Sequence, residues 1–116
     1  IGEVPREYCP GKYSVVSGNV KLVGTAQRVT PGGWLVGASI IVRNAAPVRE
    51  VLSHVYRAME IDMDPVTVAS LNEFDSTISV DDVLNALNST LRDYFEILEV
   101  DLSINELAGK RESVLV

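Results

Sequence analysis

Few residues of this chain could build a metal centre or a disulfide. It has one cysteine and one histidine among 116 residues, which excludes an internal disulfide and any cysteine–histidine pattern for zinc. Ten Lys and Arg against sixteen Asp and Glu give a net charge of −6, which argues against nucleic-acid binding. No apolar run approaches the roughly 20 residues that cross a membrane. A lone cysteine and no spanning segment predict a reducing, cytoplasmic setting.

Two further features predict no site. Glu60, Asp62 and Asp64 stand close together, but an acidic helix exit is usually a solvated turn, so we assign no metal. His54 falls on the polar face of a predicted helix and is expected at the surface. No phosphate-binding loop or nucleophile elbow is present either.

What the sequence does contain predicts a β-hairpin near its start. The turn Ser17-Gly18-Asn19 separates two β-prone runs, Tyr13–Val16 and Val20–Arg28, and Gly-Asn supplies the positive φ angles of a tight turn. A second turn over residues 30–33 leads to a third strand over 34–43. Its apolar residues occupy both faces, as in a sheet that is covered on both sides. We expect three consecutive strands in an antiparallel or mixed sheet.

Helical spacing dominates the rest of the chain. Asn44 and Pro47 open a helix that is expected to lie on the sheet. Asp64-Pro65 predicts a short helical turn, residues 72–77 a loop, and Ser79 the cap of another helix with Asp81 and Asp82 in its first turn. The first helix is expected to turn inward Val48, Val51, Leu52, Val55 and Met59, with Arg49, Glu50, Ser53, His54 and Arg57 outward. The second helix carries the stripe Val83, Leu84, Leu87, Leu91, Tyr94, Phe95 and Leu98.

The predicted class is therefore α+β, one domain over residues 1–116 with a sheet packed against amphipathic helices. Residues 99–104 fit a short strand or an extended connection, and 105–116 a final helix. The first residues, from Ile1 to Pro5, show no signal-peptide pattern, and we expect the chain to be cut from a longer one.

Lys21 is the leading candidate for chemistry. A strand lysine is usually a solvated side chain. Simple alternation, however, places Val23, Thr25, Gln27 and Val29 on the same face, so Lys21 is expected to project over an apolar groove. An ammonium there can pair with a carboxylate, a phosphate or a thioester carbonyl as charge develops.

Cys9 and two strand glycines complete the candidate site. A lone cysteine is more often a small buried apolar residue than a nucleophile. Cys9 nevertheless stands in a Pro-Gly loop that feeds the first strand of the hairpin. Gly24 and Gly37 could lie on neighbouring strands and leave room for an acyl chain, although strand glycines also mark bulges.

The segment Lys21-Leu-Val-Gly-Thr-Ala-Gln-Arg28 resembles the lysine motif of the lipoate-protein ligase and octanoyltransferase family, Arg-Lys-Ile-x-Gly-Ser-Ala-x-Arg. Tyr13 stands eight residues before the lysine, where the family also has a tyrosine. Residues 34–39 lie where the family has a His-Gly-Thr or His-Gly-Ser strand, with Val36 at the histidine, and 64–71 is similar to a later segment. The resemblance covers most of the chain and is strongest over residues 8–41.

The resemblance implies part of a biotin/lipoate ligase-like catalytic domain, its later portion, without the arginine- and glycine-rich half that precedes it in the family. Its activity would attach a lipoyl or octanoyl group to a lysine of a lipoyl-carrier domain, in a 2-oxoacid dehydrogenase or the glycine cleavage H protein. Lys21 would contact the acyl carboxyl or its adenylate. The substrate-binding residues would be Gly24, Thr25, Ala26, Gly37 and Ala38.

Two routes remain open under this resemblance. A ligase would use lipoate or octanoate with ATP and Mg²⁺. A transferase would take octanoyl from an acyl carrier protein onto Cys9 as a thioester, with Lys21 stabilising the thiolate and the oxyanion. From a different class, the chain could be an inactive binding or assembly module that forms homo-oligomers through an exposed strand edge.

Overall fold

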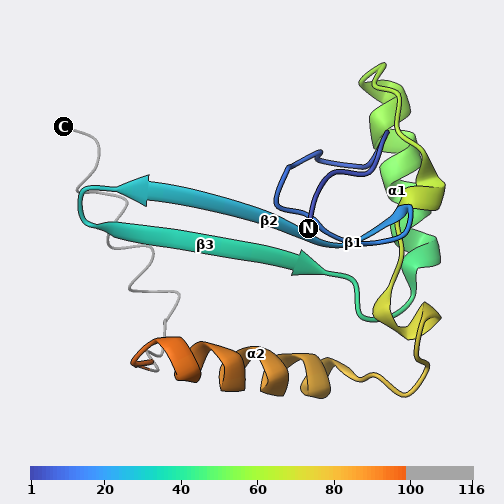
Figure 1. Ribbon diagram of the computed structural model, residues 1–116. Helices are drawn as coiled ribbons and strands as arrows, with labels where there is room; N and C mark the ends of the chain where they lie inside the picture. The colour runs from blue at the N-terminus through green and yellow to red at the C-terminus, as the bar shows by residue number, and fades with distance from the viewer. Residues whose placement is uncertain (99–116) are drawn as a thin grey trace, which may run out of the picture. The chain divides into compact units, whose positions relative to one another are not determined.

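The computed structural model describes residues 1–98, and the predictions for 99–104 and 105–116 lie outside them. It is a small α+β domain with a three-stranded antiparallel sheet and two helices, as the sequence predicts at this level (Figure 1). The strands pair in the order β1-β2-β3. In chain order the elements are β1 (Val15–Ser17), β2 (Val20–Thr30), β3 (Gly33–Ile40), α1 (Ala45–Ala58), the 3₁₀ turns η1 (Pro65–Thr67) and η2 (Leu71–Glu73), and α2 (Val80–Tyr94).

The predicted hairpin is present, with different ends. Its turn is Gly18-Asn19, and only Gly18, at a φ of 57°, takes the left-handed conformation that we expected of both residues. The first arm, β1, begins at Val15 rather than at Tyr13, and the second, β2, runs on to Thr30. The hairpin was found from its turn chemistry, which is local and requires a glycine at this position.

The third strand ends earlier than predicted. β3 stops at Ile40, three residues before the expected end at Arg43. The carbonyls of Ile41 and Val42 instead accept hydrogen bonds from the N–H groups of residues 71 and 72, at 2.9 and 3.0 Å. Residues 41 and 42 thus pair with residues 71 and 72, and they do not continue β3 as predicted.

A bulge in β2 changes the faces of that strand. Val15 lies opposite Val23 and Val16 opposite Lys21, so Leu22 has no partner on β1. An extra residue on one strand interrupts the two-residue alternation of side chains. The prediction that Lys21 shares a face with Val23, Thr25, Gln27 and Val29 is therefore wrong.

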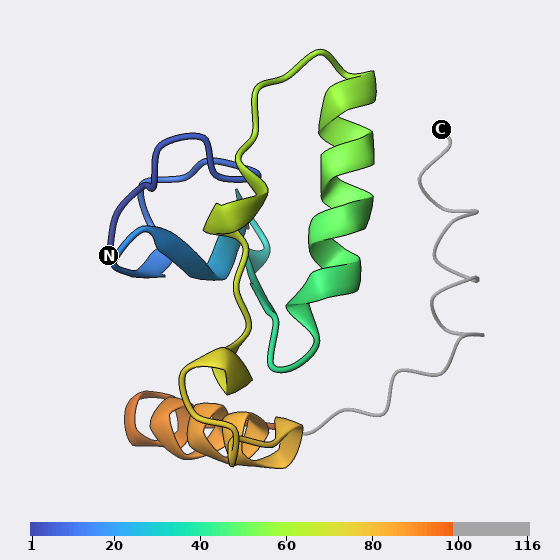
Figure 2. The same cartoon turned by 90° about the vertical axis from the view of Figure 1, so that its right-hand side faces the viewer.

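The core lies around η1 rather than between α1 and the sheet. Residues of η1 contact both α1 and β2, and Figure 2 shows this segment between the strands and the helix. Val68 is fully buried and forms a parallel bridge with Lys21 of β2. The central cluster is Tyr8, Met63 and Val68, against which Ile41, Val48, Leu52 and Tyr56 pack.

The predicted inner face of α1 is partly wrong for this reason. Val48 and Leu52 do pack on the core, but Val51, Val55 and Met59 are exposed. Arg49, expected outward, is half-buried: its Nε donates to the Val68 carbonyl at 2.7 Å and its Nη2 to the Glu73 carboxylate. The helix rotates toward the segment that covers it, which amphipathic spacing alone does not identify.

Short-range caps follow the sequence closely. The Asp64 carboxylate accepts from Val66 N at 3.1 Å, with Pro65 at the first position of η1, as predicted. At the start of α2, Ser79 Oγ accepts from Asp82 N at 3.1 Å while Asp82 Oδ2 accepts from Ser79 N at 2.9 Å. This reciprocal pair is a capping box with aspartate in the third position. Both caps confirm the predicted helix starts.

The outer part of the sheet differs from the prediction of a covered sheet. In the described part of the chain, Trp34, Leu35 and Val36 of β3 are 79, 69 and 68% exposed. β2 beyond Thr25 pairs only with β3 there, so the two strands form a two-stranded arm (Figure 1). Among residues 1–98, no helix combines the length and apolar character needed to cross a membrane.

Candidate functional site

An open pocket of about 440 Å³ lies beside β2 and β3, and we call it the Lys21 pocket. Its volume falls in the range of small-molecule sites. The structure brings all seven residues singled out from the sequence to its lining, although they come from a loop and two strands. The lining consists of Tyr8, Cys9, Lys21, Gly24, Thr25, Ala26, Gly37, Ala38 and Ser39.

The Lys21 ammonium is buried in the wall of this pocket. Lys21 is only 1% exposed, and its Nζ donates to the carbonyls of Tyr8 and Cys9 at 2.9 and 2.7 Å. Nζ also lies 4.7 Å from the centre of the Tyr8 ring, a cation–π distance. Lys21 is thus not a solvated strand lysine, and the loop over residues 8–9 covers it.

Glu7 supplies the countercharge. Its Oε1 lies 3.7 Å from Lys21 Nζ, and both side chains are essentially inaccessible to solvent. The same oxygen accepts from Gly11 N and Ser14 Oγ, each at 3.1 Å. Glu7 Oε2 has no hydrogen-bond partner among residues 1–98. The carboxylate therefore holds the loop and the lysine together, with acceptor capacity left over.

Gly24 leaves the space through which the lysine passes. A Cβ at this position would lie 3.2 Å from Cε and 3.7 Å from Nζ of Lys21. At Gly37, the other strand glycine of the site, a Cβ would meet nothing within 4 Å. Of the two glycines, Gly24 is required by packing, whereas Gly37 only keeps the pocket wide.

Cys9 lies at the exposed edge of the pocket, in a left-handed conformation with a φ of 42°. Its N–H donates to the Tyr56 hydroxyl oxygen at 2.6 Å, and that hydroxyl lies 3.6 Å from Cys9 Sγ, where it donates to the sulfur. Lys21 Nζ bonds the carbonyl oxygen of Cys9. The polar group that contacts the thiol is therefore Tyr56, a residue of α1, and not the lysine.

Burial changes the acidity of two phenols near the thiol. Desolvation raises the pKa of Tyr56 above its ordinary value, and the hydrogen bond with the Cys9 side chain adds to the rise, whereas the bond from the Cys9 backbone N–H lowers that pKa by less. Desolvation also raises the pKa of Tyr8, with smaller contributions from Cys9, Glu7 and Tyr56. Both hydroxyls therefore keep their protons at neutral pH, and Tyr56 remains a hydrogen-bond donor.

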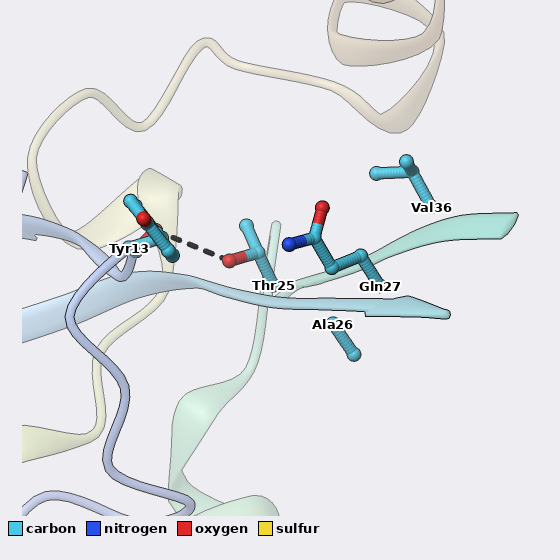
Figure 3. Close-up of a pocket in the computed structure, with 5 residues that line it drawn as sticks. All are labelled: Tyr13, Thr25, Ala26, Gln27 and Val36. Carbon is cyan, nitrogen blue, oxygen red and sulfur yellow. Dashed lines mark hydrogen bonds between the residues drawn. The ribbon is translucent and has the colours of Figure 1, made fainter. Parts of the chain in front are cut away.

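A second hollow of about 300 Å³, the Tyr13 pocket, is lined by Tyr13, Thr25, Ala26, Gln27 and Val36 (Figure 3). Figure 3 shows Thr25 and Gln27 on one side of β2 and Ala26 on the other, and Thr25 Oγ1 donates to the Tyr13 carbonyl at 3.2 Å. Among the described residues that line this pocket, the one ionisable group is the Tyr13 phenol. The charged group and the thiol both belong to the Lys21 pocket.

Sequence reasoning missed Glu7, Tyr8 and Tyr56. Tyr8 bonds Lys21 across 13 residues of chain, and Tyr56 bonds Cys9 across 47. Contacts between residues this far apart leave no spacing pattern in the sequence. Tyr13, eight residues before Lys21, makes a cation–π contact with Lys12, whereas the ring beside Lys21 Nζ is that of Tyr8. His54 is exposed, as expected.

No protein-family model matches the chain. Within residues 1–98, no three His, Cys, Asp or Glu side chains are grouped so that they could hold a metal ion.

Proposed function

We propose that the Lys21 pocket is the acyl site of a lipoate-protein ligase or octanoyltransferase that attaches lipoyl or octanoyl groups to a lysine of a lipoyl-carrier domain. The observation that carries the proposal is a buried ammonium at a pocket lined by small residues. Lys21 supplies the charge, and Gly24, Ala26, Gly37 and Ala38 leave space for an aliphatic chain. A slot of this kind suits an acyl group whose carbonyl end carries developing negative charge.

The hydrogen bonds of Lys21 leave it one donor for that charge. An ammonium has three N–H groups, and two of them bond the carbonyls of Tyr8 and Cys9. The third makes no hydrogen bond among the described residues. Because Lys21 is 1% exposed, an acyl carbonyl reaches this donor only after a small shift of the pocket wall that leaves Cys9 bonded to Tyr56. Glu7, held by Gly11 and Ser14, keeps the ammonium in place.

The thioester route is favoured by the position of Cys9 on the same pocket. The Cys9 thiolate attacks the carbonyl carbon of an octanoyl thioester, and a C–S bond to Cys9 forms. The C–S bond to the carrier breaks, and the carrier thiolate takes a proton from solvent. The amine of the acceptor lysine then attacks the acyl-Cys9 carbon, forms the amide and releases Cys9 as a thiol.

In the ligase route, lipoate or octanoate is first activated with ATP as the acyl-adenylate. Lys21 then binds the acyl carboxyl or its adenylate, and Cys9 has no covalent role. The two routes share the Lys21 pocket and differ in their need for the thiol.

The experiment incubates the chain with octanoyl-acyl carrier protein and measures the covalent octanoyl adduct by mass spectrometry. We expect an adduct that hydroxylamine removes and that Cys9→Ser abolishes. Lys21→Met should reduce it at least tenfold, whereas Lys12→Met, a matched change of an exposed lysine, should leave it intact. Absence of any adduct, together with ATP-dependent octanoylation of a lipoyl domain by Cys9→Ser, would select the ligase route. If the folded chain shows neither activity, the acyl site is refuted.

A second candidate function is a binding or assembly module. The exposed arm of β2 and β3 favours it, since Trp34, Leu35 and Val36 are uncovered and β3 contains no charged residue. This candidate predicts concentration-dependent association in sedimentation, and Val36→Lys should weaken that association. A monomer with full acyl transfer would exclude it.

A further inference from the structure

The hydroxyl of Tyr56 makes two contacts with one residue. It accepts the Cys9 backbone N–H at 2.6 Å and donates to Cys9 Sγ at 3.6 Å. The ring of Tyr56 meanwhile packs against the buried cluster of Tyr8, Met63 and Val68. The core therefore holds the ring of Tyr56 in place, and the hydroxyl of that ring fixes Cys9 in its loop.

The backbone of Cys9 needs such a hold. A φ of 42° is unusual for a residue with a side chain, and the following Pro10 constrains it further. The carbonyl of the same residue accepts from Lys21 Nζ at 2.7 Å. Both polar groups of the Cys9 backbone are thus bonded to fixed side chains, which sets the direction of the Cα–Cβ bond. Such over-determined local strain is typical of functional positions.

We infer that Tyr56 is a positioning residue for the Cys9 thiol, which it holds at the edge of the Lys21 pocket by a hydrogen bond to the sulfur. This inference rests on the thioester route of the proposed function. The bond holds the sulfur at the edge of the pocket. Hydrogen bonds to a charged acceptor are stronger than bonds between neutral groups, so a bond at this position stabilises negative charge on the attacking sulfur. After attack, the backbone bond keeps the acylated residue beside the pocket.

The competing explanation is that Tyr56 only packs. Its ring belongs to the core, and a hydroxyl at the edge of a core needs a partner simply to avoid desolvation. The two explanations differ in what the oxygen does for the reactivity of the sulfur. Tyr56→Phe separates them, because it keeps the ring and removes the oxygen.

The test measures the rate at which iodoacetamide alkylates Cys9 in the folded chain, with no acyl donor present. We expect Tyr56→Phe to slow alkylation about tenfold, the change expected for loss of one hydrogen bond to a charged sulfur. Tyr94→Phe, a matched change of an exposed tyrosine on α2, should alkylate at the wild-type rate. An unchanged rate in folded Tyr56→Phe would overturn the inference.

A second measurement covers the case in which Tyr56→Phe does not fold. Wild-type Cys9 should then alkylate faster in the native chain than in urea at the same pH, and an equal or slower native rate would overturn the inference. Octanoyl adducts are scored separately. Slower alkylation of Tyr56→Phe without any wild-type adduct would support the positioning of the thiol by Tyr56 and refute the thioester route. If Tyr56→Phe and the wild type alkylate at the same rate and the wild type forms normal adducts, the positioning role is refuted and the thioester route is supported.

Discussion

Lys21 and Gly24 are fitted to each other: a single methyl group at residue 24 would lie 3.2 Å from Lys21 Cε. That distance is shorter than ordinary carbon–carbon contact. The lysine cannot easily give way, because its Nζ is bonded to two backbone carbonyls and lies beside Glu7. The glycine is thus part of how the ammonium is placed.

Gly24→Ala should therefore displace the lysine. We expect the free energy of unfolding to fall by about 1 to 3 kcal/mol, as overpacking of a fitted site does. Acyl transfer should fall with it. Urea unfolding and the octanoyl adduct assay check both effects. Gly33→Ala is the matched control, since a Cβ there meets nothing within 4 Å, and it should change neither quantity.

Removing the buried charge of Lys21 should leave Glu7 unpaired. Lys21→Met is expected to lower the free energy of unfolding by about 3 to 5 kcal/mol, because the carboxylate stays buried without its partner. Adding Glu7→Gln to it should restore part of the loss. Equilibrium urea unfolding of both single variants and the double variant measures the coupling.

An exposed ion pair provides the comparison for that result. Arg6 and Asp62 are bonded at 2.6 Å but are 53 and 74% exposed. Arg6→Ala should lower the free energy of unfolding far less than Lys21→Met does, because solvent screens such a pair. A cost for Lys21→Met as small as that of Arg6→Ala would contradict the buried-charge account.

The end of α1 offers a stabilising change. Glu60 has a φ of 56°, and the N–H groups of Glu60 and Ile61 bond the carbonyls of Arg57 and Tyr56 at 3.1 and 3.0 Å. This is the arrangement in which glycine is preferred. Glu60→Gly should raise the free energy of unfolding by about 1 kcal/mol. Glu50→Gly, within the same helix, should lower it by a similar amount, and thermal unfolding distinguishes the two signs.

The cap of α2 predicts a pH effect. Hydrogen bonds from the Ser79 side chain and backbone lower the pKa of Asp82 below its ordinary 3.8. A lowered pKa means that the folded state favours the carboxylate. The cap therefore contributes stability above that ordinary value, and the contribution is lost as pH falls through the folded pKa. Ser79→Ala should raise the pKa of Asp82, followed by carbon NMR of its carboxyl. Thr77→Val, which removes a partner of Asp75, should leave Asp82 unchanged.

Local chemistry explains what the sequence predicted well. Gly18 in a tight turn, the Asp64-Pro65 helix start and the Ser79 cap each depend on residues within three positions of one another. Three antiparallel strands follow from two tight turns. The candidate residues around Lys21 also meet at one pocket, because Gly24 and Gly37 lie two positions out of register on paired strands.

What failed depended on distant contacts. The inner face of α1 is set by residues 63–68, which lie between the helix and β2, and helical spacing does not reveal which neighbour will cover it. Tyr56 was counted with neither face, yet its hydroxyl reaches Cys9 across 47 residues of chain. The prediction of which residues share a face with Lys21 failed because an unpaired residue in β2 cannot be detected from the alternation of apolar and polar residues.

That unpaired residue, Leu22, determines which side chains of the following part of β2 lie on which face of the arm. One residue more or fewer between Lys21 and Gly24 would turn Val23 and Gln27 toward the ammonium and send Gly24 and Ala26 to the opposite side. Deletion of Leu22 is thus the smallest change that replaces the pocket's lining while every lining side chain stays in the sequence. The lining of this site therefore depends on the number of residues between Lys21 and Gly24 as much as on their identity.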